Sequence, residues 1–429
     1  MHIFFSGIGG HAIGPLALIA KQAGYEVSGS DKQESSETKH LQEQGIQLHI
    51  GQSEEQIATV HANQSIDWLV YSSAVVRSNP NHPEIQFAKK HGIKHGKRDE
   101  LLNAIIDDHN LKLIAIAGTH GKTTTTAMAV WLFRQLGMPL SYSVGAEIGF
   151  GPMGQFDGDS EYFVYECDEF DRNFLAFHPY MSLITGIAWD HHEVFPTRED
   201  YNQAFRDFIA QSKQLVIWEG ERELLGLHEN DDCLVIKEDD PAIDQIELHG
   251  LVNRQDAWQV VQAVHKLTKR PIAELIQHMN QFPGLKQRME RLAPNLYTNY
   301  AHTPEKIKGG MNAALEIAAD NNQDIVIIYE PLTNRRQHYI KDEYKDCFTG
   351  AKKIYWVPTY LAREDPDLPV LKPEDLIPSL ADPSIAEPAK LDDDLLAAIR
   401  SHLQKGDMVV AMGANGANSL DEWLRQRFL

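Results

Sequence analysis

The stretch "AIAGTHGKTTTT", residues 115–126, decides the fold of this chain and most of its chemistry. It continues an apolar run that starts at residue 111, and it leads into "TTTAMAVWLFRQLG", residues 124–137, which suits a helix. A Gly-Lys-Thr loop between a strand and a helix exposes successive backbone N–H groups at a helix N-terminus, where the helix dipole favours anions. The stretch therefore predicts a phosphate-binding loop in an α/β domain.

Two side chains of this loop have expected roles. Lys122 is expected to reach the β- and γ-phosphates of a nucleotide, and the Thr123 hydroxyl is expected to bind Mg²⁺. The usual spacing places a glycine five residues before Gly121, where this chain has Ile116. A glycine-rich turn with an incidental lysine is the alternative. The strand before the loop and the helix after it favour phosphate binding.

Two later strand-like runs end in polar residues. They are "EYFVYECDEFD", residues 161–171, and "MSLITGIAWDHHEVF", residues 181–195. Open α/β sheets bind ligands at the carboxyl ends of their strands. A single acidic turn is usually solvated and a lone histidine is usually structural, but in series after a phosphate loop they predict an ATP site with two metal ions. The candidate ligands are Glu166, Asp168, Glu169, Asp171, Asp190, His191 and His192.

A second glycine-rich loop opens the chain, in "FSGIGGHAIG", residues 5–14, followed by "VSGSD", residues 27–31. Ala12 stands where the third glycine of a dinucleotide-binding fingerprint belongs. Asp31, about twenty residues further on, has the position of the ribose-binding acid of that fold, so an NAD-dependent dehydrogenase is an alternative. A dehydrogenase has no use for Lys122 and Thr123, which disfavours it.

Strand-like and helical segments alternate almost throughout, the pattern of parallel α/β sheets. The helical segment "RDELLNAIIDDHN", residues 98–110, closes a first unit, and "FPGLKQRMERL", residues 282–292, marks a second junction. We therefore expect three α/β domains in series, at residues 1–108, 109–290 and 291–429.

Composition excludes several classes of protein. The chain has 429 residues, 42% of them hydrophobic and 24% charged, which is ordinary for globular protein. No apolar run approaches the roughly 18 residues of a membrane-spanning helix. Three widely spaced cysteines argue against a disulfide framework and for a reducing cytoplasm. A formal net charge of −21 argues against nucleic acid as a partner.

The order of these motifs resembles the Mur ligase family, ATP-dependent enzymes that form amide bonds in peptidoglycan precursors. The matching motifs span most of the chain, and the phosphate loop with Thr-His before Gly-Lys-Thr is fairly specific to the family. The N-terminal motifs look like the subgroup that uses UDP-N-acetylmuramate itself. The motifs are "GIGG", "VSGSD", "SSAVVRSNPNHPEI", "AGTHGKTTT", "ECDEFD", "DHHEVF", "YAHTPEKI" and "YLAREDP".

The resemblance implies a Rossmann-like UDP-binding domain, a central P-loop ATPase-like domain and a Rossmann-like C-terminal domain. It implies that the second loop holds ATP and the first holds the UDP-sugar. Lys122, Glu166 and His191 would be catalytic, with Thr123, Glu166 and His191 as Mg²⁺ ligands. The implied ATP contacts are Gly118, Thr119, His120, Gly121, Lys122, Thr123, Thr124, Asn253, His302 and Arg336. The implied UDP-sugar contacts are Gly7, Gly9, Gly10, Asp31, Ser72 and Ser73.

Several positions depart from the family pattern. Gly186 and Ala188 replace an Asn and a Glu, Asn299 replaces an Asp, and "EPLTNRR", residues 330–336, is closer to the tripeptide-adding relatives. The amine implied by the resemblance is L-alanine, with a recycled tripeptide as the alternative. A relative that has lost turnover and a P-loop ATPase acting as a switch are further alternatives. A monomer or homodimer without membrane insertion is expected.

Overall fold

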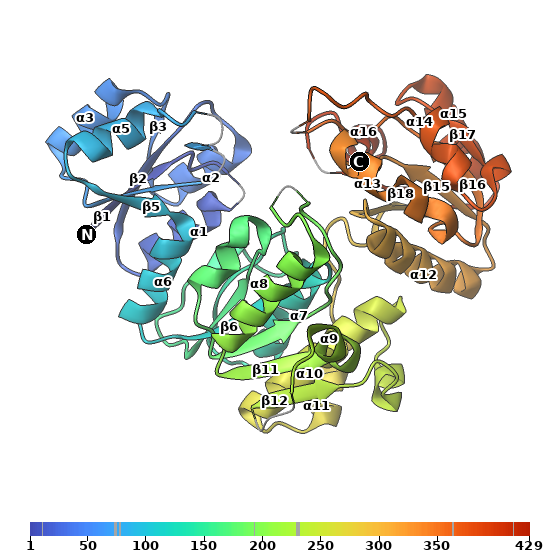
Figure 1. The fold of residues 1–429 in the computed structure, drawn as a ribbon, viewed down its shortest axis with the longest axis horizontal. Coiled ribbons are helices and arrows are strands. Elements are labelled where there is room, and N and C mark those ends of the chain that lie inside the picture. The colour runs from blue at the N-terminus through green and yellow to red at the C-terminus, as the bar shows by residue number, and fades with distance from the viewer. Residues whose placement is uncertain are drawn as a thin grey trace. The chain divides into compact units, whose positions relative to one another are not determined.

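The computed structural model describes residues 1–10, 12–72, 75–76, 79–192, 194–228, 232–362, 364–414 and 416–429. Within these residues the chain forms three mostly parallel β-sheets with helices between their strands (Figure 1). The predicted fold class, α/β units in series, is confirmed. The order of the strands shows where each sheet can bind a ligand.

The first sheet has the strand order β3-β2-β1-β4-β5, and all its pairs are parallel. The chain passes from β1 outward to β3 and returns to β4, so the order reverses between β1 and β4. Ligands of such sheets bind at that point, outside the carboxyl ends of the strands. The elements are β1 (His2–Ser6), α1 (Ile13–Gln22), β2 (Glu26–Asp31), α2 (Ser36–Glu43), β3 (Gln47–Ile50), α3 (Glu54–Asn63), β4 (Trp68–Tyr71), α5 (Pro83–Lys90), β5 (Lys94–Lys97) and α6 (Arg98–Asp108).

The second sheet has the order β12-β11-β10-β6-β9-β7-β8, with only the β7–β8 pair antiparallel among its described pairs. β6 lies at its centre and leads into the phosphate loop. Its strands are β6 (Lys112–Ala117), β7 (Ser141–Ser143), β8 (Gly154–Gln155), β9 (Tyr162–Glu166), β10 (Met181–Ile184), β11 (Gln214–Trp218) and β12 (Cys233–Ile236). Its helices are α7 (Lys122–Gln135), α8 (Arg198–Ala210), α9 (Glu219–Leu225), α10 (Leu251–Thr268) and α11 (Ile272–Met279), with the 3-10 segments η1 (Phe170–Ala176) and η2 (Pro241–Gln245).

The third sheet has the order β13-β14-β18-β15-β16-β17 and is parallel apart from β13. Alternate residues of β15 enter different cores, Ile327 on one face and Ile328 on the other, as expected for a buried parallel strand. Its strands are β13 (Glu290–Ala293), β14 (Leu296–Asn299), β15 (Ile325–Tyr329), β16 (Ala351–Trp356), β17 (Ala386–Pro388) and β18 (Met408–Met412). Its helices are α12 (Pro304–Asn321), α13 (Asn334–Ile340), α14 (Pro373–Leu376), α15 (Asp393–Gln404) and α16 (Leu420–Phe428), with the 3-10 segments η3 (Lys341–Asp346), η4 (Ile377–Ser379) and η5 (Pro383–Ile385).

The chain divides into two compact units, residues 1–242 with 256–282, and residues 243–255 with 283–429. The first unit contains the first two sheets. Leu101 of α6 lies in one core with Phe5 of β1 and Leu113 of β6, so α6 joins these sheets. The second unit contains the third sheet. This division is coarser than the three domains expected from the sequence, whose limits remain a prediction.

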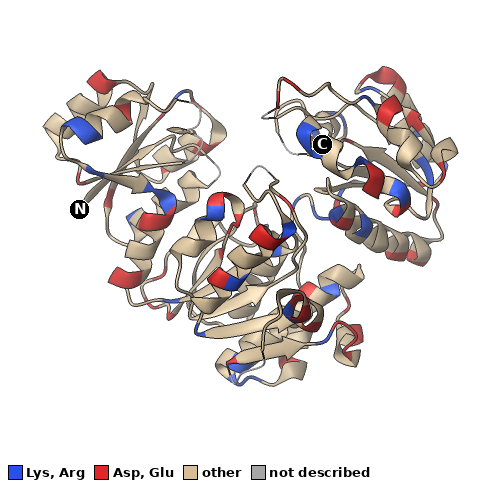
Figure 2. Ribbon diagram, viewed as in Figure 1, with Lys and Arg blue, Asp and Glu red and all other residues tan. Residues whose placement is uncertain are grey.

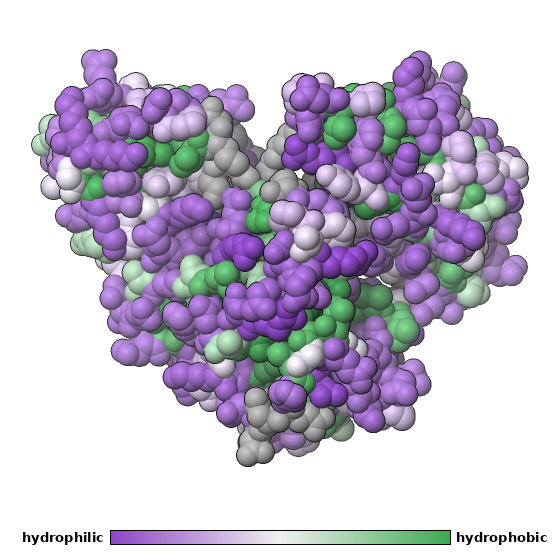
Figure 3. Space-filling view, viewed as in Figure 1, coloured by the Kyte–Doolittle hydropathy of each residue, from purple (hydrophilic) through white to green (hydrophobic). Residues whose placement is uncertain are grey.

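Charged residues of both signs lie on the helices of both units (Figure 2), and the face drawn in Figure 3 is mostly hydrophilic. Among the described helices, none is both long enough and apolar enough to span a membrane. The three cysteines, Cys167, Cys233 and Cys347, are free thiols.

Candidate active site

The phosphate loop, residues 118–121, joins β6 to α7. Gly118 and Gly121 have φ values of +150° and +78°, in a region that favours glycine. A Cβ on Gly118 would collide with Thr185 Oγ1, and one on Gly121 would lie 2.9 Å from Asp256 Oδ1. Both glycines are therefore required by the backbone and by the neighbouring side chains, and α7 can begin directly at Lys122.

Hydrogen bonds fix this loop to the segment after β10. The Thr119 amide donates to Gly186 O at 2.7 Å. The Thr119 hydroxyl donates to Ala188 O at 2.8 Å and accepts from Ala188 N at 2.9 Å. A Cβ on Gly186 would lie 2.6 Å from His120 Nε2. The departure from the family pattern at Gly186 therefore leaves the space that the His120 ring occupies.

Lys122 is held by a buried carboxylate. Its Nζ donates to Glu169 Oε2 at 2.7 Å and to the carbonyl oxygen of Gly118. Glu169 is only 1% exposed and the Lys122 side chain 14%, so water screens this pair only weakly. Burial alone would lower the pKa of Lys122, but Glu169 and Asp168 raise it above its usual value. The Lys122 amine therefore stays protonated beside the loop, as phosphate binding requires.

Thr123 and Glu166, which were expected to supply oxygen ligands, lie side by side. The Thr123 hydroxyl donates to Glu166 Oε1 at 2.9 Å, and the Gly145 amide donates to Oε2 at 3.0 Å. Burial raises the pKa of Glu166, and the Lys122 charge opposes the rise. A hydroxyl beside one carboxylate fits Mg²⁺, which takes few protein ligands and completes its shell with phosphate and water oxygens. The described residues contain no cluster of three or more His, Cys, Asp or Glu arranged for a metal.

The structure places His191 beside Glu169. His191 has φ +55° and is contacted edge to face by Phe170, at 4.9 Å between ring centres. Its Nε2 lies 3.8 Å from Glu169 Oε1. Glu169 was one of several acidic candidates in the sequence, and the structure distinguishes it as the residue next to both Lys122 and His191.

Two other acidic candidates have different surroundings. Asp168 lies 3.9 Å from an Nη atom of Arg98. Asp190 is buried and accepts a hydrogen bond from the His191 amide at 2.8 Å. Asp190 therefore supports the turn that carries His191.

The sequence did not single out Tyr201. It lies in α8 among apolar residues and is fully buried. Its hydroxyl lies 2.7 Å from Thr119 Oγ1 and donates to Glu169 Oε1 at 3.2 Å. Burial, and then the charge of Glu169, raise the pKa of Tyr201 well above its usual value, so the hydroxyl keeps its proton. No local pattern distinguishes this tyrosine from an ordinary core residue.

The first loop, after β1, is closed by its own backbone and by Asp31. The amides of Gly7 and Ile8 both donate to Ser30 O at 2.9 Å, and Gly10 N donates to Gly7 O at 3.2 Å. Gly9 N donates to Asp31 Oδ2 at 2.8 Å. Asp31, expected near the uridine, thus also stabilises the glycine loop.

A cavity of about 310 Å³ lies near the carboxyl ends of β2 and β3, lined by Lys32, Gly51, Gln52, Asn79, His82 and Pro83. Ser72 follows β4 and is half-buried, and Ser73 lies outside the described residues. Near the cavity, Glu84 is fully buried and accepts a hydrogen bond from Ser6 Oγ at 2.5 Å. Burial raises the pKa of Glu84 to about 7. Polar groups thus surround the end of β1 where the loop begins.

Three expected nucleotide contacts belong to the second unit. Asn253 is in the first turn of α10, where its Nδ2 donates to His249 O at 2.7 Å. His302 is buried, with its ring 4.6 Å from that of Tyr300. Arg336 lies on α13. Their part in an ATP site remains a prediction, because the phosphate loop is in the first unit.

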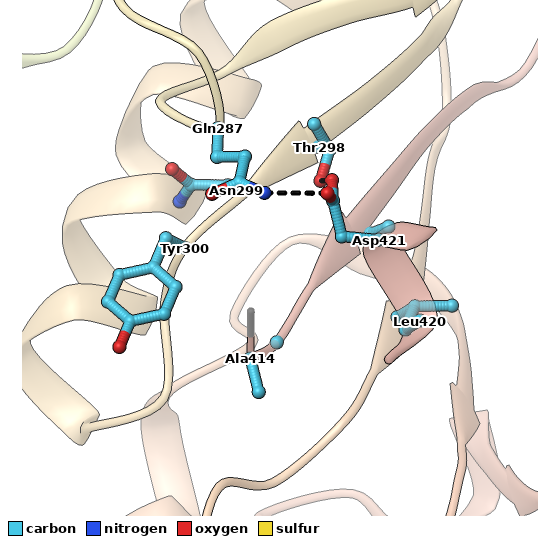
Figure 4. A pocket seen from close by; sticks show the side chains of 9 residues that line it. Gln287, Thr298, Asn299, Tyr300, Ala414, Leu420 and Asp421 are labelled. Atoms are coloured by element: carbon cyan, nitrogen blue, oxygen red, sulfur yellow. Dashed lines mark hydrogen bonds between the residues drawn. The ribbon is translucent and has the colours of Figure 1, made fainter. Parts of the chain in front are cut away.

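Asn299, which stands where the family resemblance implies an aspartate, lies against α12. A Cβ on Gly310 would collide with its Nδ2, and its Oδ1 accepts from Met289 N at 3.3 Å. Figure 4 shows Asn299 at a pocket where Gln287 Nε2 donates to Asp421 Oδ2 at 2.6 Å. The pocket measures about 10 Å³, room for about one water molecule and not for an amino acid.

Comparison with known proteins gives two family matches. The description "Mur ligase family, catalytic domain" matches residues 2–110, and "Mur ligase middle domain" matches residues 116–257. Relatives named UDP-N-acetylmuramate–L-alanine ligase include the following two. The one from Nocardioides sp. is 30% identical and covers 97% of this chain and 94% of its own length. The one from Clostridium novyi is 27% identical and covers 98% of this chain and 96% of its own length.

Solved structures show the same fold. UDP-N-acetylmuramate-alanine ligase from Thermotoga maritima has a TM-score of 0.71 and 21% identity, covering 99% of this chain and 98% of its own. A murein peptide ligase from Psychrobacter arcticus has a TM-score of 0.64 and 21% identity, covering 99% of both chains. At this identity the likeness concerns the fold, so it does not decide between the two substrates.

Proposed function

Since the chain belongs to the Mur ligase family, we propose that it is a cytoplasmic, ATP-dependent ligase of peptidoglycan precursor synthesis. It joins L-alanine to the lactyl carboxylate of UDP-N-acetylmuramate. The observation that carries this proposal is the glycine loop with Lys122 on buried Glu169 and Thr123 on Glu166. The names of the nearly full-length relatives support the choice of substrates.

The chemistry explains why such a loop is needed. A carboxylate is a poor electrophile, so it first takes the γ-phosphoryl group of ATP and becomes an acyl phosphate, with release of ADP. The amine of L-alanine then attacks the acyl carbon, and the tetrahedral intermediate expels phosphate. Catalysis of phosphoryl transfer is mostly alignment and neutralisation of charge. Lys122 supplies a fixed positive charge at the phosphates.

Magnesium fits the oxygen pair of Thr123 and Glu166, and it would neutralise phosphate charge when bound. His191 is proposed as a ligand of a second ion. The remaining proposed ATP contacts are Gly118, Thr119, His120, Gly121, Thr124, Asn253, His302 and Arg336. The UDP-sugar is proposed to bind Gly7, Gly9, Gly10, Asp31, Ser72 and Ser73, beside the cavity of about 310 Å³.

A recycled tripeptide is the second candidate for the amine. A long, doubly acidic peptide needs basic residues, and Arg335, Arg336 and Lys341 were the candidates in the sequence. Arg335 already pairs with Asp365 at 3.0 Å, and this hydrogen bond lowers the pKa of Asp365. Arg335 is therefore already engaged by the protein itself, which favours the smaller amine.

The deciding experiment measures phosphate release from ATP with and without UDP-N-acetylmuramate and with a panel of amines. The panel is L-alanine, glycine, L-serine and the L-Ala-γ-D-Glu-diaminopimelate tripeptide. We expect release to require the UDP-sugar and to have the highest kcat/KM with L-alanine. A higher kcat/KM with the tripeptide would assign the recycling reaction. Release without the sugar would indicate a simple ATPase, and binding of both ligands without release would indicate a relative that has lost turnover.

A further inference from the structure

The Tyr201 hydroxyl lies between the phosphate loop and the carboxylate that holds Lys122. The ring packs against Phe195 and Phe205, at 4.9 Å and 5.2 Å between ring centres. These ring contacts do not need the hydroxyl. The hydroxyl contacts Thr119 and Glu169, which lie 82 and 32 residues away in the sequence. A phenylalanine would fill the same space and leave both contacts unmade.

Glu169 is shared by three side chains. Its Oε2 accepts from Lys122 Nζ at 2.7 Å. Its Oε1 accepts from the Tyr201 hydroxyl at 3.2 Å and lies 3.8 Å from His191 Nε2. Because Glu169 is 1% exposed, water has little access to replace a partner that moves away. The hydrogen bonds that stabilise this carboxylate therefore come from the side chains around it and not from water.

When a nucleotide binds, its phosphates would compete with the present acceptors of Lys122. Its amine donates to Glu169 and to the Gly118 carbonyl oxygen in this structure, and nucleotide phosphates would compete for the same protons. If the amine turns toward the phosphates, Glu169 loses its nearest cation. A buried carboxylate without partners is strongly unfavourable, so nucleotide binding depends on what else holds Glu169.

We propose that Tyr201 is a positioning residue, which keeps Glu169 hydrogen-bonded while Lys122 moves from Glu169 to the nucleotide phosphates. Tyr201 acts through Glu169 and Thr119 and does not itself touch the substrates. The inference rests on the proposed function of the loop as an ATP site. It predicts that loss of the hydroxyl strengthens the hold of Glu169 on Lys122 and weakens nucleotide binding.

The test compares Tyr201→Phe with Tyr142→Phe in the full chain. Tyr142 is a buried tyrosine of β7 in the same unit whose hydroxyl interacts with Arg134, and it is the matched control. The non-hydrolysable analogue AMP-PNP with Mg²⁺, and separately UDP-N-acetylmuramate, are titrated by calorimetry. We expect Tyr201→Phe to weaken AMP-PNP binding about tenfold, as loss of one hydrogen bond to a charged group predicts. The UDP-sugar affinity should stay unchanged, and Tyr142→Phe should change neither affinity.

Glu169→Gln separates positioning from mere packing. Without the charge of Glu169, Lys122 is released to the phosphates, so AMP-PNP should bind about three- to tenfold more tightly. In the Glu169→Gln background, Tyr201→Phe should change the affinity less than about twofold, because the two residues act as one unit. Weaker binding by Glu169→Gln, or equal effects of Tyr201→Phe in both backgrounds, overturns the proposal.

An unchanged AMP-PNP affinity in Tyr201→Phe also overturns the proposal. If Tyr201→Phe does not fold, the proposal is decided by whether Glu169→Gln binds AMP-PNP more tightly, as expected, or more weakly. A chain that binds AMP-PNP but not UDP-N-acetylmuramate would contradict the ligase function, while the nucleotide titrations would still decide the role of Tyr201.

Discussion

The two glycine-rich loops of the first unit follow buried strands in the same way but carry opposite charge. The loop after β1 has the Asp31 carboxylate on its Gly9 amide. The loop after β6 carries Lys122 at the first position of α7, beside buried Glu169. The second loop therefore suits a triphosphate with a metal ion. The first loop suits a ligand with fewer charges and with hydroxyl groups, because the Asp31 carboxylate can accept hydrogen bonds from hydroxyls.

The largest effect is expected from a substitution that impairs the second loop and leaves the first loop intact. Lys122→Ala removes the cation at the phosphates and leaves Glu169 buried without it, so kcat should fall by about 10³ or more. UDP-N-acetylmuramate affinity should stay within about twofold, because the first loop is separate. Phosphate release and calorimetry measure the two effects. The control is Lys112→Ala, at the start of β6, the strand before the loop, because its partner Glu161 is exposed. Equal loss of both affinities in a folded variant would contradict the separation of the sites.

A methyl group at Gly118 should distort the same loop. Its φ of +150° disfavours alanine, and the new Cβ would collide with Thr185 Oγ1. We expect kcat/KM for ATP to fall about a hundredfold, and Tm to fall by several degrees. Gly137 is the control, because it also has a positive φ, +64°, but no atom within 4 Å of an added Cβ. If Gly118→Ala and Gly137→Ala behave alike, close packing at Gly118 does not matter.

The matching change in the first loop should have a smaller effect, and it should weaken binding of the UDP-sugar and not of the nucleotide. An added Cβ on Gly9 would lie 2.8 Å from Thr38 Cγ2 and 3.0 Å from Asp31 Oδ2. Gly9→Ala should therefore weaken UDP-N-acetylmuramate binding about tenfold and leave AMP-PNP binding unchanged. Gly158→Ala, with open space around its Cβ, is the control. NAD binding by the unaltered chain, without binding of the UDP-sugar, would reverse the assignment of this loop.

The last expected effect concerns stability and not ligand binding, namely its pH dependence beneath the first loop. Burial raises the pKa of Glu84 from about 4.5 to about 7, so the folded state binds an extra proton between these values. The contribution of Glu84 to stability is present below about pH 4.5 and is lost as pH rises to about 7. Glu84→Gln keeps a hydrogen-bond acceptor for Ser6, and because glutamine does not ionise, the variant does not lose this stability as pH rises. It should match the unaltered chain at pH 5 and be more stable at pH 8, by at most about 3 kcal/mol.

Thermal unfolding measured from pH 5 to pH 8 tests this prediction. Glu54→Gln is the control, because Glu54 is 53% exposed and pairs with a lysine at the surface. A stability difference between Glu84→Gln and the unaltered chain that does not grow with pH would show that Glu84 is ionised in the folded protein throughout the range.

The sequence by itself predicted the α/β class and the position of the phosphate loop, and the family resemblance implied Thr123 and Glu166, whose side chains the structure brings together. Apolar strands, helical periodicity and the Gly-Lys-Thr motif are local patterns, and they persist in the fold because β6 and α7 directly flank the loop. The carboxyl ends of β6 and β9 meet because these strands are parallel neighbours, so polar residues after each were correctly expected together.

Only the tertiary structure decided which polar groups meet. Glu169 was one acid among several until the fold placed it on Lys122, and Tyr201 looked like a core residue of α8. Gly186 was only a departure from the family pattern in the sequence, and the structure shows that the His120 ring occupies the space beside it. These partners are 32 to 82 residues apart or lie on different strand ends, and their contacts depend on side-chain packing between elements. Local periodicity contains no information on such contacts, because it reports which face of an element is buried and not what lies against it.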